Sequence, residues 1–418
     1  MLQADFLIRN AREILTCAGA GPLAGSRQGQ VSAIPNASLA ALDGVIQFVG
    51  PAADTASQVT LRPDAVVIDA DDCAIVPGFV DAHTHAVFAG DRRTELRRRL
   101  GGATYAEIAA GGGGIVSTVT ATREATVEEL VAQSRPRLDE MLASGTTTCE
   151  IKSGYGLDVA SELRILRSIA ELQRLHPIDI VATFMGAHEI PPEHRNRRDE
   201  YVAMVIEEML PAVASEKLAT WCDVFCETGV FTPAESLRIL DTGIRHGLKP
   251  RIHADELGPS GGSQVAAQVG ARSADHLIFV PDEGIQALAG AGVVATLLPN
   301  AAFYLKLGRF APARKLIEAG VPVALATDVN PGGGFSPSMP FAIALACFGM
   351  NMTFEESLVA ATANGAWSLD VRDRVGSLEP GKFADAVVVH GEAINLIRMG
   401  APSISAVIKR GRVVGRTS

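Results

Sequence analysis

The chain has 418 residues, of which 47% are hydrophobic and 20% charged, and its formal net charge is −10. This composition excludes collagen-like, disordered and disulfide-rich proteins, and the acidic balance argues against a partner made of nucleic acid, which needs a basic surface. The length predicts one large α/β domain with a smaller satellite.

The six cysteines are few and scattered, as expected of a protein in a reducing cytosol. Cys222 and Cys226 are predicted core thiols, because no second pair follows to complete a zinc site. The start, MLQADFLIRNARE, carries charges where a secretory signal needs an apolar run. The uncharged stretch 329–354 contains three prolines and leaves only 341–350 as a usable apolar segment, whereas a membrane helix needs about 20 residues. We therefore expect a soluble, cytoplasmic protein with no membrane partner.

The two ends of the chain have the same β-rich character. Residues 1–75 contain LDGVIQFVG and an alternating run that ends in a turn, and residues 372–418 contain FADAVVVHGE and ISAVIKRGRVVG. Period-two alternation with turn residues is typical of strands. We expect these two segments to pair into one small β-sandwich domain.

The middle of the chain, 76–371, alternates short apolar runs with segments of helical length such as 159–176 and 354–369. This rhythm favours βα units around a parallel sheet. Eight such runs predict a (β/α)8 barrel; they are 76–85, 146–153, 180–188, 221–228, 250–256, 273–277, 293–299 and 322–328. The first connection, 86–123, includes four consecutive glycines at 111–114 and is a candidate cover for an active site.

Polar side chains stand where these runs end, which in such a barrel is where function resides. His83 and His85 alternate on the first run, so both imidazoles should point into the barrel mouth. The later runs end in or near Lys152, Tyr155, His188, Glu227, His253, Glu256, His276 and Asp328. Three imidazoles and a carboxylate fit one Zn²⁺ or a similar divalent ion with a position left for water.

The HTH after VPGFVDAH, the histidines of the fifth and sixth runs, the aspartate of the eighth and the tail GSLEPGKFADAVVV resemble the amidohydrolase superfamily. Within it, seven further strings are similar to the imidazolonepropionase family: GGGGIVSTVTATREA, EIKSGYGL, FMGAHEIPPE, CDVFCETGVF, IHADELGPSGG, SADHL and APARKLIEAGVPVALATDVNPG. The resemblance covers nearly the whole chain. It implies hydrolysis of the ring C–N bond of 4-imidazolone-5-propanoate by metal-activated water, giving N-formimidoyl-L-glutamate in histidine degradation.

The resemblance also implies a role for individual residues. One metal ion, Zn²⁺ or else iron, is expected on His83, His85, His253 and Asp328. Asp328 and His276 would hold the attacking hydroxide, Glu256 would move a proton to the ring nitrogen, and His188 would hydrogen-bond the carbonyl oxygen. Arg92 would clamp the carboxylate arm of the substrate. Further substrate contacts are implied for Tyr155, Asn330, Gly332, Gly333 and Tyr105.

Each assignment has an ordinary structural alternative. Arg92 stands in DRRTELRRRL, where an arginine usually lies on a solvated helix face. Tyr155 could pack, and Glu256 could be a salt-bridge partner. Lys152 does not stand on the strand that supplies a carboxylated, metal-bridging lysine in the superfamily, so one metal is expected, although Lys152 or Glu227 as a ligand to a second ion stays open.

Two rival functions also stay open. The same ligand set serves other cyclic amidohydrolases and deaminases of aminoheterocycles, because the metal site does not fix the substrate. The second rival is a non-catalytic binding or scaffold protein whose barrel has lost its enzymatic activity. Such a protein would be expected to lose the metal ligands that this chain keeps. A homodimer is implied by the resemblance alone, and the sequence does not tell whether the glycine-rich segment closes over substrate.

Overall fold

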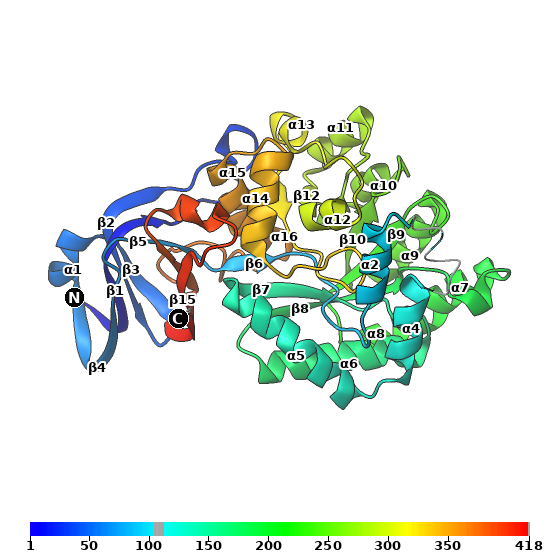
Figure 1. Ribbon diagram of the computed structural model, residues 1–418, viewed down its shortest axis with the longest axis horizontal. Coiled ribbons are helices and arrows are strands. Elements are labelled where there is room, and N and C mark those ends of the chain that lie inside the picture. The colour runs from blue at the N-terminus through cyan, green and yellow to red at the C-terminus, as the bar shows by residue number, and fades with distance from the viewer. Residues whose placement is uncertain (104–106, 108–112, 417–418) are drawn as a thin grey trace.

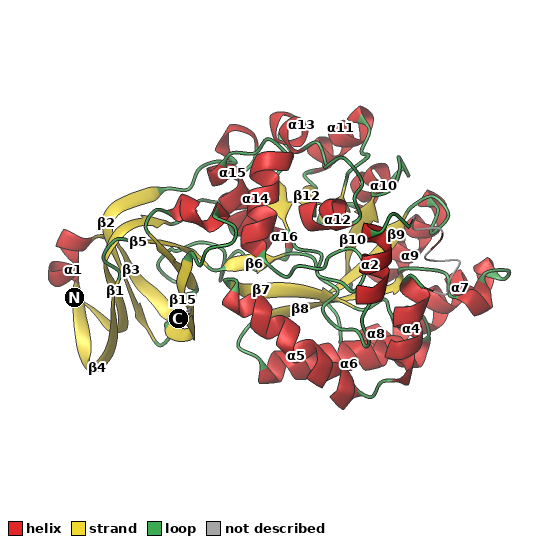
Figure 2. Ribbon diagram, in the orientation of Figure 1, coloured by secondary structure: helices red, strands yellow, loops and turns green. Residues whose placement is uncertain are grey.

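The computed structural model describes residues 1–103, 107 and 113–416. Figure 1 shows a small β-rich part, in which both ends of the chain meet, beside a larger part in which strands are surrounded by helices. Figure 2 shows that most helices belong to the larger part. This arrangement confirms the predicted fold class of a barrel with a small domain built from both chain ends.

The small part is one connected sheet in the order β16-β15-β14-β5-β1-β2-β3, with β4 also paired to β1. Its buried core includes Phe6 and Ile8 from the beginning of the chain and Val388 and Ile408 from the end. The strands are β1 (Leu2–Leu15), β2 (Ala33–Leu42), β3 (Val45–Pro51), β4 (Val59–Asp69), β5 (Cys73–Pro77), β14 (Ala386–His390), β15 (Ile404–Lys409) and β16 (Arg412–Arg416). Apolar side chains from both ends thus share one core, which ties the termini together.

The larger part holds eight parallel strands in sequential order. They are β6 (Phe79–Asp81), β7 (Thr146–Lys152), β8 (Asp179–Ala187), β9 (Trp221–Cys226), β10 (Lys249–Ala254), β11 (Ser273–His276), β12 (Val294–Leu297) and β13 (Val323–Leu325). The ring closes just beyond the first and last strands, where the His85 N–H donates to the Val329 carbonyl at 2.9 Å and the Thr327 hydroxyl donates to Asp81 at 2.6 Å. Each of the eight predicted runs therefore contains or adjoins one barrel strand.

Helices follow most of the strands, as predicted. In α6 (Val159–Leu175), Asp158 caps the first turn by accepting from the Ser161 N–H at 2.8 Å, and one apolar face is buried against the barrel. The others are α1 (Ala52–Gln58), α2 (Arg93–Leu100), α4 (Ile115–Glu124), α5 (Val127–Ala143), α7 (Arg198–Met204), α8 (Leu210–Glu216), α9 (Pro233–Arg245), α10 (Gly262–Val269), α11 (Asp282–Ala291), α12 (Pro299–Tyr304), α13 (Ala313–Glu318), α14 (Met339–Gly349), α15 (Phe354–Ala361) and α16 (Ala363–Ser368). The 3-10 helices are η1 (Gly25–Arg27), η2 (Pro192–His194) and η4 (Ala393–Ile397). A π-helix, η3 (Val205–Met209), joins α7 to α8.

Two predicted elements are divided in the structure. The run 76–85 begins inside β5 of the small sheet, and the barrel strand β6 starts after Gly78, where the chain passes from one sheet to the other. Position 78 has no room for a side chain, because a Cβ there would lie 2.3 Å from the Thr147 hydroxyl. The domain boundary expected between residues 75 and 76 thus falls within β5. The helix expected at 354–369 breaks at Thr362 into α15 and α16. In the described part of the chain, no helix is both long enough and apolar enough to cross a membrane.

Candidate metal centre and active site

Three histidines meet at the carboxyl ends of the barrel strands. His83 and His85 follow β6 and His253 stands on β10, and one ring nitrogen of each lies within 4.8 Å of those of the other two. The Nε2 atoms of His85 and His253 are 3.4 Å apart, and all three side chains are buried. Nitrogen atoms at this spacing could hold one metal ion.

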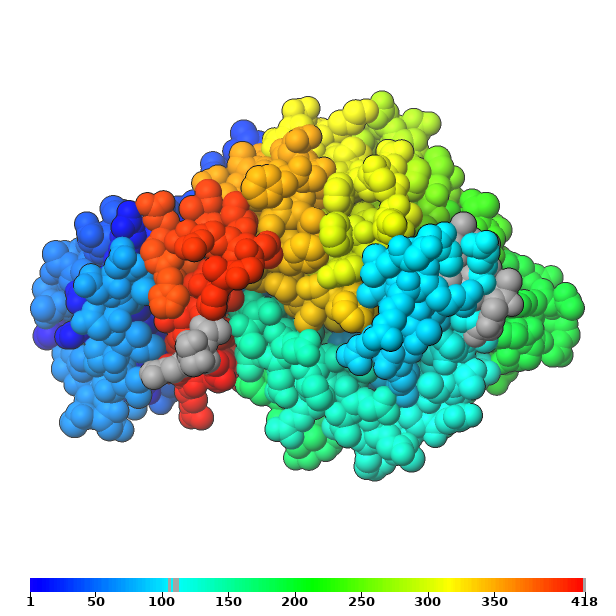
Figure 3. Space-filling view, viewed as in Figure 1, coloured from blue at the N-terminus to red at the C-terminus, as the bar shows by residue number. Residues whose placement is uncertain are grey.

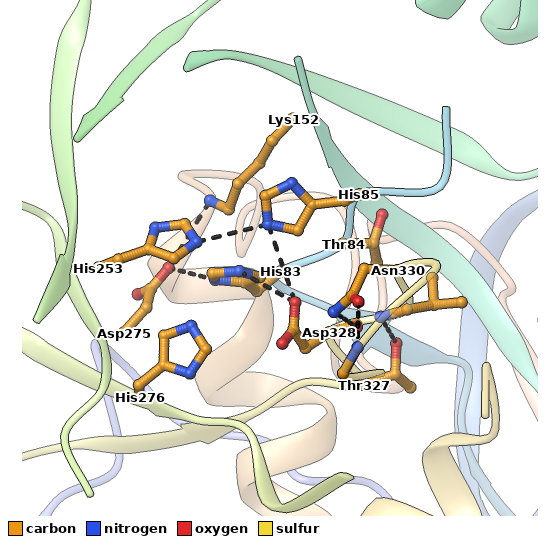
Figure 4. A network of polar contacts seen from close by, with 12 residues as sticks. His83, Thr84, His85, Lys152, His253, Asp275, His276, Thr327, Asp328 and Asn330 are labelled. Carbon is orange, nitrogen blue, oxygen red and sulfur yellow. Dashed lines mark hydrogen bonds and ion pairs between the residues drawn. The ribbon is translucent and has the colours of Figure 1, made fainter. Parts of the chain in front are cut away.

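Asp328, which follows β13, lies beside this cluster (Figure 4). Its Oδ1 is 3.5 Å from His83 Nε2 and 3.8 Å from His85 Nε2. The backbone of Asp328 has φ +52, in the left-handed region that few non-glycine residues adopt, and its N–H donates to the His83 carbonyl at 3.1 Å. Burial raises the pKa of Asp328 to about 8, so this carboxylate calls for a neighbouring cation to stay ionised.

The imidazoles are held in the form that a metal requires. His83 Nδ1 donates to Asp275 Oδ2 at 2.6 Å, and His253 Nδ1 donates to Asp223 Oδ1 at 3.0 Å. The proton on each Nδ1 leaves Nε2 with a free lone pair, and His83 Nε2 is buried with no hydrogen-bond partner among the described residues. Burial, and then the charge of Lys152, hold the pKa of His83 well below its usual value. Neutral imidazoles aimed at one point, with a carboxylate beside them, fit a divalent ion.

Sequence reasoning missed the residues behind these histidines. Asp223 and Asp275 stand inside β9 and β11, and neither was predicted to belong to the site. The available signal was a charged residue in the middle of an apolar strand, as in WCDVFC, because such a side chain is rarely buried unless it is paired.

Lys152, on β7, is part of the same group of charges. Its Nζ donates to Glu150 Oε1 at 2.6 Å and to Asp223 Oδ2 at 2.7 Å. Burial would lower the pKa of Lys152, but the charges of Asp223 and Glu150 outweigh burial and raise it. Lys152 is therefore an ammonium paired with carboxylates, one of which also accepts from His253.

Glu256 and His276 lie on the other side of the cluster. Glu256 Oε1 is 3.6 Å from His276 Nδ1, and both side chains are buried. Burial, followed by the charges of Asp328 and Glu227, raises the pKa of Glu256 well above its usual value. This setting favours the protonated form of the carboxyl group, which suits a residue that accepts a proton and passes it on.

Glu227, at the end of β9, has two backbone partners. Its Oε2 accepts from the Leu257 N–H at 2.9 Å, and its Oε1 accepts from the Thr228 N–H at 2.8 Å. It does not belong to the cluster of potential metal ligands found among the described residues. In this position it fixes the backbone next to Glu256.

A cavity of about 490 Å³ opens from the cluster and is lined by His85, His253, Glu256, His276 and Asp328 at its base. Tyr155 and His188 line one wall, and the His188 ring stacks on His85 with centroids 4.8 Å apart. His188 Nδ1 lies 3.0 Å from the Gly154 carbonyl, which can only accept, so Nδ1 carries the proton and Nε2 is an acceptor while the ring is neutral. Burial, and then the charge of His253, lower the pKa of His188 to about 3.

The far end of the cavity is basic. Arg92, just before α2, donates from Nε to Glu95 Oε2 at 2.7 Å, and Glu95 Oε1 accepts from the Gly114 N–H at 2.9 Å. The guanidinium lies directly against Gly332, where a Cβ would come within 2.3 Å of Nη1. Figure 3 shows the cyan segment that holds α2 beside the yellow segment that holds α12; there Arg99 donates to the Tyr304 carbonyl at 3.2 Å. A guanidinium in such a wall can bind a carboxylate.

Asn330 organises the loop that follows Asp328. Its Oδ1 accepts from the N–H groups of Gly332 and Gly333 at 2.8 and 2.6 Å, and its Nδ2 donates to the Asp328 carbonyl at 2.8 Å. Asn330, Gly332 and Gly333 all line the cavity. Tyr105, the remaining predicted contact, lies outside the described residues.

Comparison with known proteins gives concordant results. Residues 74–414 match the model of the amidohydrolase family. The chain is 49% identical over 417 residues to an imidazolonepropionase from Symbiobacterium thermophilum, covering 99% of this chain and 98% of the relative. It is 47% identical over 412 residues to an imidazolonepropionase from Geobacillus kaustophilus, covering 97% of each.

Two solved structures have a similar fold. One is an atrazine chlorohydrolase from Arthrobacter aurescens complexed with zinc, with a TM-score of 0.72 and 18% identity, covering 98% of this chain and 95% of the other. The second is an adenosine deaminase from Xanthomonas campestris with bound zinc, with a TM-score of 0.67 and 20% identity, covering 99% and 93%. At these identities the likeness extends to the fold and not to the substrate.

Proposed function

Because this chain belongs to the amidohydrolase family and, within it, to the imidazolonepropionases, we propose that it hydrolyses 4-imidazolone-5-propanoate to N-formimidoyl-L-glutamate in histidine degradation. The observation that carries this function is 44% to 49% identity, over almost the entire chain, to relatives that all have this name. The chain is thus a hydrolase that acts on a small molecule.

We assign one metal ion to His83, His85, His253 and Asp328. When bound, such an ion supplies Lewis acidity that lowers the pKa of a water molecule to about 7. Zn²⁺ is our first assignment and iron the second, since three imidazoles and one carboxylate suit either. The ion pairs of Lys152 and the two backbone bonds of Glu227 favour a single ion.

The proton is handled by Glu256, with Asp328 and His276 beside it. Asp328 and His276 orient the attacking water toward the ring carbonyl carbon. The water oxygen bonds to that carbon, the bond from the carbon to the ring nitrogen breaks, and Glu256 passes the proton of the water to that nitrogen. Its raised pKa supports this role, because the group must hold a proton between the two transfers.

The substrate is oriented by groups around the cavity. Arg92 binds the propanoate carboxylate, and Tyr155, Asn330, Gly332, Gly333 and Tyr105 complete the contacts. We assign His188 to the ring carbonyl oxygen. To donate to that oxygen, the neutral His188 ring would carry its proton on Nε2 and give up its hydrogen bond to the Gly154 carbonyl, a change of tautomer that needs no additional proton.

The proposal extends to a cytoplasmic homodimer without nucleic-acid or membrane partners. The formal charge of −10 supports the exclusion of nucleic acid. Sedimentation of the purified protein tests the dimer.

The direct test is turnover of freshly made 4-imidazolone-5-propanoate, followed by ultraviolet absorbance, before and after chelation and after zinc add-back. Metal-dependent loss of the substrate is expected. His253→Ala should abolish metal binding and turnover together, whereas His246→Ala, at an exposed histidine that directly follows α9, should leave both unchanged. The proposal would be refuted if the metal-loaded protein did not hydrolyse this substrate but converted aminoheterocycles that lack a carboxylate arm.

A further inference from the structure

Five charged side chains form a buried layer inside the barrel, next to the histidines. They are Glu150, Lys152, Asp223, Arg251 and Asp275, and each is 0% exposed. Removing charges from water is costly unless each is paired in good geometry. A layer of this kind in place of an apolar core indicates a task beyond filling the barrel.

Lys152 is the centre of this layer. Its Nζ lies 2.6 Å from Glu150 Oε1, 2.7 Å from Asp223 Oδ2 and 3.7 Å from Asp275 Oδ2. Two of these carboxylates are the ones that receive the Nδ1 protons of His253 and His83. In Figure 4 the His83 ring lies between Asp275 and Asp328. One ammonium therefore joins the supports of two histidines that come from different strands.

The partners of Lys152 are themselves fixed. Glu150 Oε1 accepts from the Thr183 hydroxyl at 2.5 Å, and its Oε2 accepts from the Thr84 N–H at 3.1 Å, in the segment between His83 and His85. Arg251 differs from Lys152, because it donates to the Ser368 and Ala82 carbonyls at 2.8 and 2.9 Å as well as to Asp275 at 3.3 Å. Arg251 thus ties the layer to the barrel wall, while the three close partners of Lys152 are all carboxylates.

From this geometry we propose that Lys152 is a positioning residue of the metal centre: an internal cation that holds Asp223 and Asp275 in place, so that His253 and His83 present Nε2 to the ion. The proposal rests on the metal centre assigned above. It also gives Lys152 a role other than that of a ligand to a second ion, because its ammonium lies among the carboxylates that such an ion would need.

Two possible roles of Lys152, repulsion of the metal ion by its charge and positioning of the carboxylates, predict opposite effects on metal affinity when Lys152 is replaced. An ammonium near a divalent cation repels it, so if charge alone mattered, Lys152→Met would strengthen metal binding. If Lys152 positions the carboxylates, the same substitution lets Asp223 and Asp275 move and the two imidazoles lose their fixed tautomer and orientation. Loss of an outer partner of a metal ligand typically weakens metal binding about 10- to 100-fold, and we expect about 10-fold here because Lys152 acts through one further group.

The experiment measures zinc affinity by competition with a chelator, on full-length wild type, Lys152→Met and Lys409→Met, with no substrate present. Lys409 is a matched control, since it is 5% exposed and pairs with two carboxylates, Asp179 at 2.8 Å and Asp385 at 2.6 Å. Asp179 begins β8, at the end of the barrel opposite the histidines. Both substitutions should lower thermal stability, but only Lys152→Met should weaken zinc binding.

A second readout follows the imidazoles themselves. In the zinc-loaded protein the Nδ1 protons of His83 and His253, bonded to carboxylates, should give downfield proton resonances. Lys152→Met should shift or broaden both, and Lys409→Met should leave them in place. Zinc affinity that is unchanged or stronger in Lys152→Met, or an equal loss in Lys409→Met, would overturn the proposal.

If Lys152→Met does not fold, Glu150→Gln replaces it, because this change removes one carboxylate from Lys152 without touching a histidine. A several-fold loss of zinc affinity is then expected, and unchanged affinity would count against the role of Lys152. Since zinc affinity is read without substrate, failure of this proposal is distinct from failure of the proposed reaction, which only turnover tests.

Discussion

The contact between Gly332 and Arg92 makes a sharp prediction about substrate binding. A Cβ at position 332 would lie 2.3 Å from Arg92 Nη1 and 2.6 Å from its Cζ. To reach an ordinary contact the guanidinium must move by about 1 Å, and that movement strains its bond to Glu95 at 2.7 Å. A misplacement of this size in a group that orients substrate can cost about 100-fold in catalysis.

Gly332→Ala should therefore raise KM for 4-imidazolone-5-propanoate by about 10- to 100-fold, with a smaller change in kcat. The cost in stability should stay near 1 kcal/mol, the low end for overpacking, because the group that yields is the end of a flexible side chain and the φ of Gly332 is not in the left-handed region. Kinetics and thermal denaturation of the same preparations separate these two effects.

A double-mutant cycle provides the control. In an Arg92→Ala background the added methyl group has no guanidinium to displace, so Gly332→Ala should then change KM little further. If Gly332→Ala raised KM by the same factor with and without Arg92, or left KM unchanged in the parent protein, the assignment of Arg92 to the substrate carboxylate through this contact would be refuted.

Three further predictions concern the metal and the ion pairs. Removal of the metal by a chelator should abolish turnover while circular dichroism stays that of a folded protein, and zinc should restore the rate. Asp275→Asn should weaken zinc binding about 10- to 100-fold, because an amide N–H facing His83 Nδ1 favours the tautomer with its proton on Nε2; chelator competition measures this. Burial would raise the pKa of Glu235, but the hydrogen bonds from Arg198 and Thr232, together with the charge of Arg198, outweigh burial and lower the pKa from 4.5 to about 2. Since the pKa is lower in the folded state, this stabilisation is complete above about pH 4.5 and is lost toward pH 2, so the difference in melting temperature between wild type and Glu235→Gln should shrink as the pH falls through this interval.

Much of the candidate site could be predicted because it stands where strands end. Alternation places His83 and His85 on one side of the chain, and parallel strands bring their carboxyl ends to one edge of the sheet, so His253 and Asp328 had to come near them. The structure brings these four residues together. Strand ends alone left His188, Glu227 and His276 as further candidates, and the resemblance to the amidohydrolase superfamily selected these four residues.

The layer next to the histidines depends on pairings that one sequence does not contain. Asp223 reaches His253 because β9 and β10 pair with Phe225 opposite His253. Without that register, Lys152 could equally have faced a metal ion or a carboxylate. The division of the run 76–85 has a similar cause, because its two halves are both apolar and only their sheet partners differ.

The layer also orients two of the histidines through ion pairs inside the barrel. Each of its three carboxylates has a cationic partner within the barrel, and two of them also accept from a histidine. These contacts orient the imidazoles of His83 and His253. Three carboxylates and two cations leave one negative charge, and an ionised Asp328 adds a second. A divalent ion matches that charge, which favours its binding over a monovalent cation. Small structural zinc sites instead gain their fold from the ion. In this barrel, by contrast, ion pairs hold the two carboxylates that accept from His83 and His253.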